Sequence, residues 1–145
     1  MNKIISLIAT DAEGIAKAQK LRRLVFGDEQ GFSTELDVDG KDEKSIHILL
    51  YVENKSEPIA GGRLTIENDL GILSRIAVMP AHRGSGIGKR VVMELEKVAA
   101  EKMVKKLSLD PHDYLEKFYA NMGYKKVMGD KLVANYHLIT MTKSI

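Results

Sequence analysis

The chain contains no cysteine among its 145 residues. Disulfide bonds and thiolate metal sites are therefore excluded, and the composition suits a reducing cytoplasm, which is the localisation we expect. Histidine offers no metal site either, because His47, His82 and His137 share no ligand spacing with one another. We expect no bound metal.

Long hydrophobic runs are also missing. The apolar run of residues 4–9 is too short for a signal peptide and far too short to span a bilayer. The formal net charge is only +2 and no patch combines basic with aromatic residues, so we expect neither a membrane nor a nucleic acid as partner. An apolar content of 44% in 145 residues is enough for one core, and we expect a single domain over residues 1–145.

Charge is distributed unevenly along the chain. Residues 28–43 contain seven acids against the single base Lys41, and residues 75–106 contain eight bases against three acids. The first region can attract a cationic amine and the second an anionic cofactor. The alternative, two solvated faces of unlike charge, explains each run equally well.

Apolar spacing predicts a mixed, largely antiparallel α/β domain. We expect strands over residues 3–9, 46–53, 59–67, 72–79, 106–109, 124–128 and 132–141. Thr10 or Asp11 is expected to cap a first helix with one apolar face: Ile15, Ala18, Leu21 and Val25. Gly61-Gly62 indicates a bulge in the third strand. We expect residues 32–44 to form an acidic loop or a short helix. Asp110 or Asp113 is expected to cap a last helix.

One segment, residues 80–89 (PAHRGSGIGK), joins a predicted buried strand to a predicted amphipathic helix. The apolar positions of that helix are Ile87, Val91, Leu95, Val98 and Met103. The N–H groups at a helix start lack internal partners, and the helix dipole favours an anion there. Glycines at 84, 86 and 88 remove the side chains that would keep a ligand away. We therefore predict a pyrophosphate cradle with Arg83 and Lys89 as counter-charges.

The cradle matches neither of two familiar phosphate-binding motifs. A P-loop requires Gly at position 83 and Ser or Thr at position 90, and both positions are Arg. The dinucleotide fingerprint requires G-x-G-x-x-G within an early βαβ unit, whereas these glycines are two apart and lie past mid-chain.

The remaining pattern, Arg83-x-x-Gly86-x-Gly88 after a strand that ends in Val-Met-Pro, resembles the acetyl-coenzyme A signature of the GNAT N-acetyltransferase superfamily. A second segment, residues 118–124 (FYANMGY), resembles the helix-then-strand segment that follows in that family. Together the matching segments cover residues 57–125. The resemblance implies a small single-domain enzyme of bacterial type with a twisted, largely antiparallel sheet of about six to seven strands, splayed in the middle and flanked by about four helices.

The same resemblance implies a reaction. Acetyl-coenzyme A would be the co-substrate, and its acetyl group would pass to the primary amine of a small molecule or peptide by direct attack on the thioester. The cofactor would lie in the splay of the sheet, with its pantetheine arm on the strand edge at Ile76, Ala77 and Val78. A backbone N–H near Val78 would polarise the thioester carbonyl. A homodimer is compatible with the family.

Other cofactor and catalytic residues follow by position. The predicted pyrophosphate-binding residues are Arg83, Gly84, Ser85, Gly86, Ile87, Gly88 and Lys89. Phe118 is included as a cofactor contact, although core packing explains it most simply. Tyr119 matches the family's general acid for the departing thiolate. Because a phenol of pKa about 10 is a weaker acid than a thiol of about 8.5, a hydrogen bond to the thiolate is sufficient.

The proton acceptor carries no fixed motif. Glu29 and Glu67 are candidates for the catalytic base, and a surface role explains either as well. The family usually has Asn seven residues before the tyrosine, and this chain has His112 there. His112 can bind the cofactor, act as a base, or lie exposed at a helix start.

Two other functions remain open. Residues 22–26 (RRLVF) and 35–39 (ELDVD) resemble the acyl-homoserine-lactone synthases, which use an acyl carrier protein and S-adenosylmethionine. On that similarity, Phe26 and the acidic loop would shape an acceptor pocket. The other alternative is a non-catalytic coenzyme A sensor or interaction module on the same scaffold.

Overall fold

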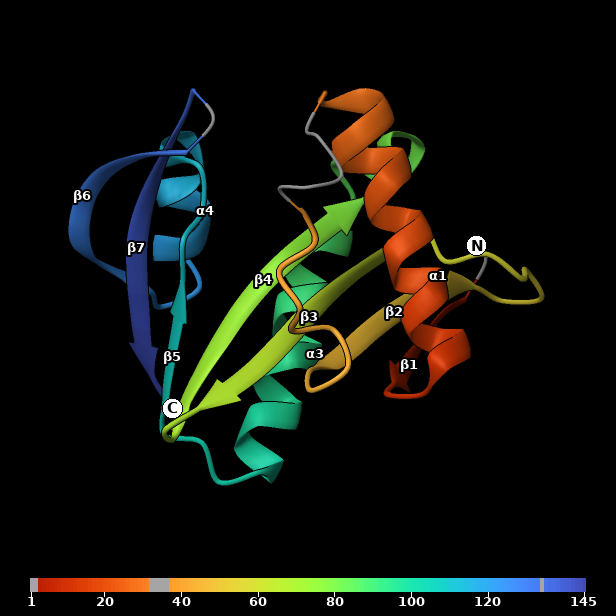
Figure 1. The fold of residues 1–145 in the computed structure, drawn as a ribbon, viewed down its shortest axis with the longest axis horizontal. Coiled ribbons are helices and arrows are strands. Elements are labelled where there is room, and N and C mark those ends of the chain that lie inside the picture. Colours follow the sequence, from red (N-terminus) through yellow and green to blue (C-terminus); the bar gives the residue numbers. More distant parts are fainter. Residues whose placement is uncertain (1–2, 32–36, 134) are drawn as a thin grey trace.

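Seven strands form one twisted sheet, in the order β1-β2-β3-β4-β5-β7-β6 (Figure 1). The structure is a computed structural model that describes residues 3–31, 37–133 and 135–145. The strands are β1 (Ile4–Ala9), β2 (Ile46–Val52), β3 (Ala60–Glu67), β4 (Leu70–Val78), β5 (Lys106–Leu109), β6 (Lys125–Val133) and β7 (Tyr136–Ser144). Among these strands only β4 and β5 pair in parallel, which confirms the predicted mixed, largely antiparallel sheet.

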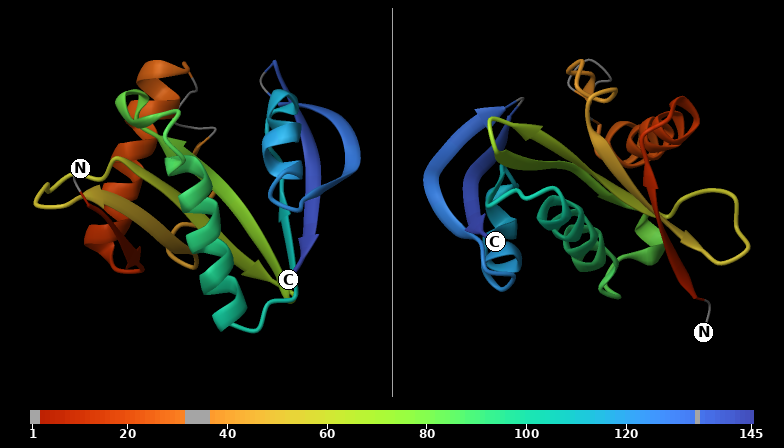
Figure 2. Two further views of the ribbon diagram at one scale, coloured as in Figure 1. Left: turned by 180° about the vertical axis from the view of Figure 1, so that it is seen from behind. Right: turned by 90° about the horizontal axis from the view of Figure 1, so that it is seen from below.

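Helices cover both faces of this sheet. The described residues contain three α-helices, where about four were expected: α1 (Ala12–Arg22), α3 (Ile87–Glu101) and α4 (Glu116–Ala120). α1 continues into the π-helical segment η1 (Arg23–Glu29), and short 3-10 turns, η2 (Pro80–His82) and η3 (Asp113–Leu115), precede α3 and α4. Figure 2 shows α3 and α4 on one face and α1 on the other.

The first helix forms as its sequence predicts. Asp11 caps α1, because its Oδ1 accepts a hydrogen bond from the backbone N–H of Gly14 at 2.8 Å. The predicted apolar face is buried in full: Ile15, Ala18, Leu21 and Val25. The predicted cap of the last helix is wrong. Neither Asp110 nor Asp113 caps η3 or α4, and the side chain of Asp110 contacts β6 and β7 instead.

The long helix α3 packs closely on the middle of the sheet. A Cβ atom on Gly62 of β3 would lie 2.7 Å from Val91 Cγ1, so only glycine permits this approach. The predicted apolar positions are buried where they fall within the helix: Ile87, Val91, Leu95 and Val98. Met103 was predicted to belong to the same face, and this is wrong, because the helix ends at Glu101 and Met103 is 72% exposed.

The sheet splits between its two parallel strands. β4 pairs with β5 only at its beginning, through residues 70–72 opposite residues 106–108. Beyond this point the strands diverge, and the V between β4 and β5 is clear in Figure 1. The other edge of β4 stays paired with β3 up to Val78, opposite Ala60. Within the described part of the chain, the second half of β4 therefore has one edge without a strand partner, as the predicted splay requires.

An irregularity in β4 accompanies the split. The pairing changes from Gly61 opposite Ala77 to Arg63 opposite Ser74, so β4 carries one more residue than β3 over this interval. The expected bulge therefore occurs at this position, with its extra residue in β4. Arg75, within the bulge, has a left-handed φ of +56°, a conformation that is uncommon for residues other than glycine.

A network of charged side chains fixes the chain after η1 against the sheet. Its members are Arg22, Arg63, Arg75, Asp37, Asp39 and Asp42. Arg22 and Arg63 are almost fully buried, and each forms hydrogen bonds with two of the aspartates. Three positive and three negative charges balance, so these three acids of the acidic run do not form a free surface for a cation. Residues 32–36 of that run, Glu35 included, lie outside the described residues.

This network predicts a loss of stability in acid. Burial favours neutral Asp39, but hydrogen bonds from Arg63 and Lys41 outweigh it and lower the pKa of Asp39 to about 2. A carboxylate with a depressed folded-state pKa contributes stability above its unfolded pKa of about 4, and the contribution disappears as pH falls to about 2. We expect the free energy of unfolding, measured with urea, to fall across that range, and Asp39→Asn to flatten the fall.

Asp28→Asn is the control, because Asp28 is exposed and forms no ion pair with the described residues. It should preserve the wild-type slope. An unchanged slope in Asp39→Asn would contradict the expectation.

Candidate active site

The loop before α3 presents a row of unpaired backbone N–H groups. From residue 84 to residue 89 no backbone N–H donates a hydrogen bond to any described residue, and the first helical bond runs from Arg90 N to Gly86 O at 3.0 Å. Side chains do not cap the helix start. Six consecutive donors at the positive end of a 15-residue helix are an arrangement that suits an anion.

Glycine is required at two points of this loop. Gly84 and Gly86 have φ of +80° and +83°, and a Cβ atom built on either would meet nothing within 4 Å. The backbone conformation therefore favours glycine at both positions, and the space beside them is open to a ligand. Gly88 lies beneath Val78 and Phe118, at 3.7 and 4.0 Å from a built Cβ. These positions agree with the predicted cradle.

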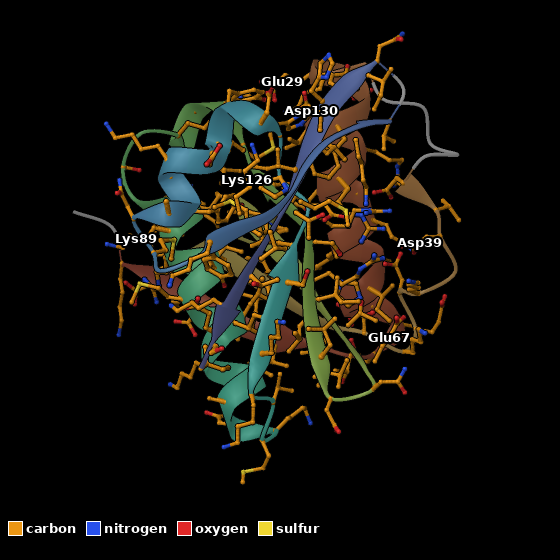
Figure 3. All side chains as sticks on the ribbon, turned by 90° about the vertical axis from the view of Figure 1, so that its left-hand side faces the viewer. Glu29, Asp39, Glu67, Lys89, Lys126 and Asp130 are labelled. Atoms are coloured by element: carbon orange, nitrogen blue, oxygen red, sulfur yellow. The ribbon has the colours of Figure 1, made fainter. Side chains whose placement is uncertain are left out.

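The side chains of the loop have distinct surroundings. Ile87 is buried, so only its backbone is available to a ligand, whereas Lys89 is exposed and projects from the surface in Figure 3. The Ser85 hydroxyl donates to the His82 carbonyl at 3.0 Å. An exposed cation beside the free N–H groups suits a diphosphate.

Arg83 is already engaged by a carboxylate. Its guanidinium donates through both terminal nitrogens to the two oxygens of Glu29, and through Nε to Val78 O at 3.0 Å. The hydrogen bonds from Arg83 lower the pKa of Glu29. Glu29, proposed from the sequence as a base, thus lies at the loop as a weakly basic group.

A cavity of about 260 Å³ fills the V between the two arms of the sheet. One wall is β4 from residue 73 to 76, and the opposite wall is the chain after β5, residues 109–112. Phe26 of η1 and Tyr119 of α4 also line it. Tyr136 of β7 spans the gap, because its hydroxyl donates to Gln30 O at 3.0 Å.

Tyr119 lines this cavity as a largely buried side chain. The residue is 5% exposed, packed edge-on against the rings of Phe118 and Tyr124 at 4.9 and 5.8 Å. The Tyr119 hydroxyl forms no hydrogen bond with any described residue. Every fully buried side-chain polar atom in the described chain has a hydrogen-bond partner, so this hydroxyl is not fully buried. It is therefore accessible, and Tyr119 is one of the residues that line the cavity. Burial raises the pKa of Tyr119 to about 12, so it is a neutral hydrogen-bond donor at pH 7.

The open edge of β4 faces the cavity. Met79 N donates to Ile59 O on the β3 side at 2.8 Å. Because backbone direction alternates along a strand, the N–H of Val78 points to the other edge, and Ile76 lines the cavity. Ala77 turns its backbone toward β3, so only two of the three predicted edge residues can pair with a ligand in the V.

His112 lies in the wall of the cavity. Its ring stacks on Tyr114 at 5.1 Å and meets the edge of Tyr136 at 5.5 Å. Burial lowers the pKa of His112 below its usual value, so the imidazole is neutral at pH 7. Glu67 is at the far end of β3 and forms ion pairs with Lys41 and Lys44, both at 3.3 Å, which places it away from the cavity (Figure 3).

Sequence reasoning missed Asp110, Arg75 and Tyr136, which all line the cavity. A signal existed for Asp110, because it directly follows β5 and ligands of open α/β sheets bind beyond the carboxyl ends of parallel strands. No sequence signal marked Arg75 or Tyr136. Arg75 is a left-handed residue inside a strand and Tyr136 forms a contact across the V, and both features depend on the assembled fold.

The described ranges offer neither a metal site nor a membrane-spanning helix. Residues 3–31, 37–133 and 135–145 contain no group of three or more His, Asp or Glu side chains placed to hold a metal ion. None of the helices in the same ranges is both long enough and apolar enough to cross a membrane.

Comparison with known proteins agrees with this geometry. Residues 11–124 match the acetyltransferase (GNAT) family. Two Bacillus subtilis proteins are similar over most of their length: the uncharacterized protein YyaT, 33% identical over 97% of this chain and 95% of its own, and the uncharacterized N-acetyltransferase YjcF, 32% identical over 87% and 88%. Escherichia coli ElaA has the same fold, with a TM-score of 0.84 at 23% identity over 99% of both chains.

The loop can be tested with Gly86→Glu. A left-handed φ of +83° costs a residue with a Cβ about 1–2 kcal/mol, and the new carboxylate repels a diphosphate. We predict that the fold persists by circular dichroism and that binding of coenzyme A, measured by calorimetry, weakens by roughly tenfold or more. Gly40→Glu is the matched control, since Gly40 also has a left-handed φ (+75°) with open space above it. Equal affinity in both variants would refute the cradle.

Proposed function

Because the chain belongs to the GNAT family of N-acetyltransferases, we propose that it transfers an acetyl group from acetyl-coenzyme A to a primary amine by direct attack on the thioester. The observation that carries the proposal is the unpaired Tyr119 hydroxyl in the cavity beside the open edge of β4. The free N–H groups of residues 84–89 at the start of α3 support it. Small-molecule and peptide amines are both candidate acceptors.

The coenzyme is proposed to lie along one continuous path. The N–H groups of residues 84–89 and Lys89 hold the diphosphate, and Phe118, exposed beside Gly88, covers the adjoining part of the coenzyme. The pantetheine arm then follows the open edge of β4, where Val78 N–H donates to the thioester carbonyl. One such preorganised donor is worth about 3 kcal/mol in the transition state.

Tyr119 is proposed to stabilise the leaving thiolate without giving up its proton. With a pKa of about 12 for Tyr119 and about 8.5 for a thiol, full transfer is uphill by about 5 kcal/mol. A hydrogen bond from the neutral hydroxyl to the developing negative charge has no such cost.

His112 is the better candidate for the proton acceptor. A lysine-like amine of pKa about 10.4 needs about 4.6 kcal/mol to become neutral at pH 7, and a base or water relay offsets part of this. His112 lines the cavity as a neutral imidazole, whereas Glu29 is bound to Arg83. We therefore assign proton removal to His112, directly or through water.

Tyr119→Phe tests the reaction. We expect kcat for thiol release from acetyl-coenzyme A in the presence of an amine to fall by roughly tenfold or more, with little change in cofactor affinity. Tyr124→Phe is the matched control, because its hydroxyl binds Glu96 Oε2 at 2.7 Å and should leave turnover within about twofold. Tight cofactor binding without turnover on any amine in the wild type would instead indicate a non-catalytic module.

The pH dependence tests the attacking group. Burial lowers the pKa of His112, so this residue is already in its basic form at pH 7 and its titration falls below neutrality. The amine must still lose a proton, so kcat/KM is expected to rise between about pH 7 and pH 9. Steady-state rates across this range give the profile, and a flat one would contradict rate-limiting attack by the neutral amine.

A further inference from the structure

Two carboxylates line the cavity, and they differ in how firmly they are neutralised. Asp37 accepts hydrogen bonds from Arg22 at 2.9–3.1 Å and from Arg75 Nε at 3.1 Å, and Arg22 is 2% exposed. Breaking a buried ion pair is strongly destabilising, because it leaves an uncompensated charge. Asp37 is therefore part of the scaffold and is closed to a ligand cation.

Asp110 has partners that can be exchanged. Its Oδ2 accepts from Lys131 Nζ at 2.7 Å and its Oδ1 from Thr140 Oγ1 at 2.6 Å. The side chains of Lys131 and Asp110 are 46% and 39% exposed. An exposed pair of this kind contributes little to stability, so an incoming ammonium group can replace Lys131 at little cost.

Lys131 is the register neighbour of a residue that lines the same cavity. It pairs with Leu138 across the β6–β7 hairpin, and Val133 pairs with Tyr136. Leu138, Val133 and Tyr136 all line the cavity, and strand alternation puts Lys131 on the face of β6 that Val133 occupies. The lysine can therefore turn toward solvent and leave the carboxylate of Asp110 facing the cavity, held by Thr140.

The charge that the reacting nitrogen must have decides which part of the acceptor binds at Asp110. That nitrogen must be neutral to attack, and an adjacent carboxylate would raise its pKa and keep it protonated. Asp110 therefore suits a second nitrogen of the acceptor, one that stays charged throughout. The rest of the cavity wall is mostly apolar and aromatic, which suits a short methylene chain between the two nitrogens.

We infer that Asp110 binds a second ammonium group of the acceptor in place of Lys131, and that the preferred acceptors are small diamines or polyamines. The inference rests on the proposed function. As the free amine forms the new C–N bond, the thioester C–S bond breaks. One proton of the reacting nitrogen passes to His112 and then to water, and the sulfur leaves as a thiolate that takes a proton from solvent.

The test compares 1,4-diaminobutane with butylamine, which has the same chain and one nitrogen. We expect the wild type to prefer the diamine by roughly tenfold or more in kcat/KM, and Asp110→Asn to remove that preference while leaving butylamine within about twofold. Asn retains the size of Asp and can still accept from Thr140. Lys131→Met removes the competing cation and should lower KM for the diamine. Lys126→Met, at another β6 lysine, which pairs with Glu116 at 3.9 Å, is the control and should change neither substrate.

Several results would overturn the inference. Equal kcat/KM for the two amines in the wild type would do so, as would equal losses for both amines in Asp110→Asn. An absence of turnover on every amine would count against the proposed function alone. In that case calorimetry of 1,4-diaminobutane decides the site, since tighter binding to the wild type than to Asp110→Asn supports it and equal binding overturns it.

Discussion

The divergence of β4 from β5 is the constraint on which the site depends. Three residue pairs join the strands, and beyond residue 72 this edge of β4 has no strand partner among the described residues. An edge left unpaired inside a domain is normally a liability, because its N–H and C=O groups need partners. A bulge at Arg75 lies in β4 within this stretch, and Tyr136 contacts Gln30 across the V. In our proposal this strand edge pairs with the amide groups of the pantetheine arm.

The Arg–Asp network joins the first helix to one wall of the gap. Replacing a buried ion pair with apolar groups is often neutral for stability, so such a network contributes mainly by fixing the positions of the segments that it joins. Asp37 connects Arg22 of α1 with Arg75 of β4, and so ties the helix to the bulge. Arg22 and Asp37 also belong to the segments that resemble the acyl-homoserine-lactone synthases. Because both residues belong to this network, their structural role explains the resemblance to those synthases without a shared substrate.

Local features of this protein were predictable from its sequence, and contacts between distant segments were not. The cradle at residues 84–89 depends on glycine conformation and a helix start, and the buried faces of α1 and α3 on apolar spacing, all within about a dozen residues. The pairs Arg83–Glu29 and Tyr136–Gln30 join residues that are 54 and 106 positions apart. Asp110 resembled a helix cap because aspartate is common there, and the tertiary partners Lys131 and Thr140 outweighed that preference.

The pairing of Arg83 with Glu29 changes what each residue can contribute. Glu29 neutralises the guanidinium, so in our proposal the attraction for a diphosphate comes mainly from the six free N–H groups and from Lys89. Val78 O accepts from Nε of the same arginine, which connects the loop to the end of β4. Arg83 therefore fixes the loop relative to the strand edge that receives the pantetheine arm in our proposal. Glu29 in turn holds η1, and η1 carries Phe26 in the cavity wall. A contact at the loop before α3 thus helps to position a residue of the cavity wall.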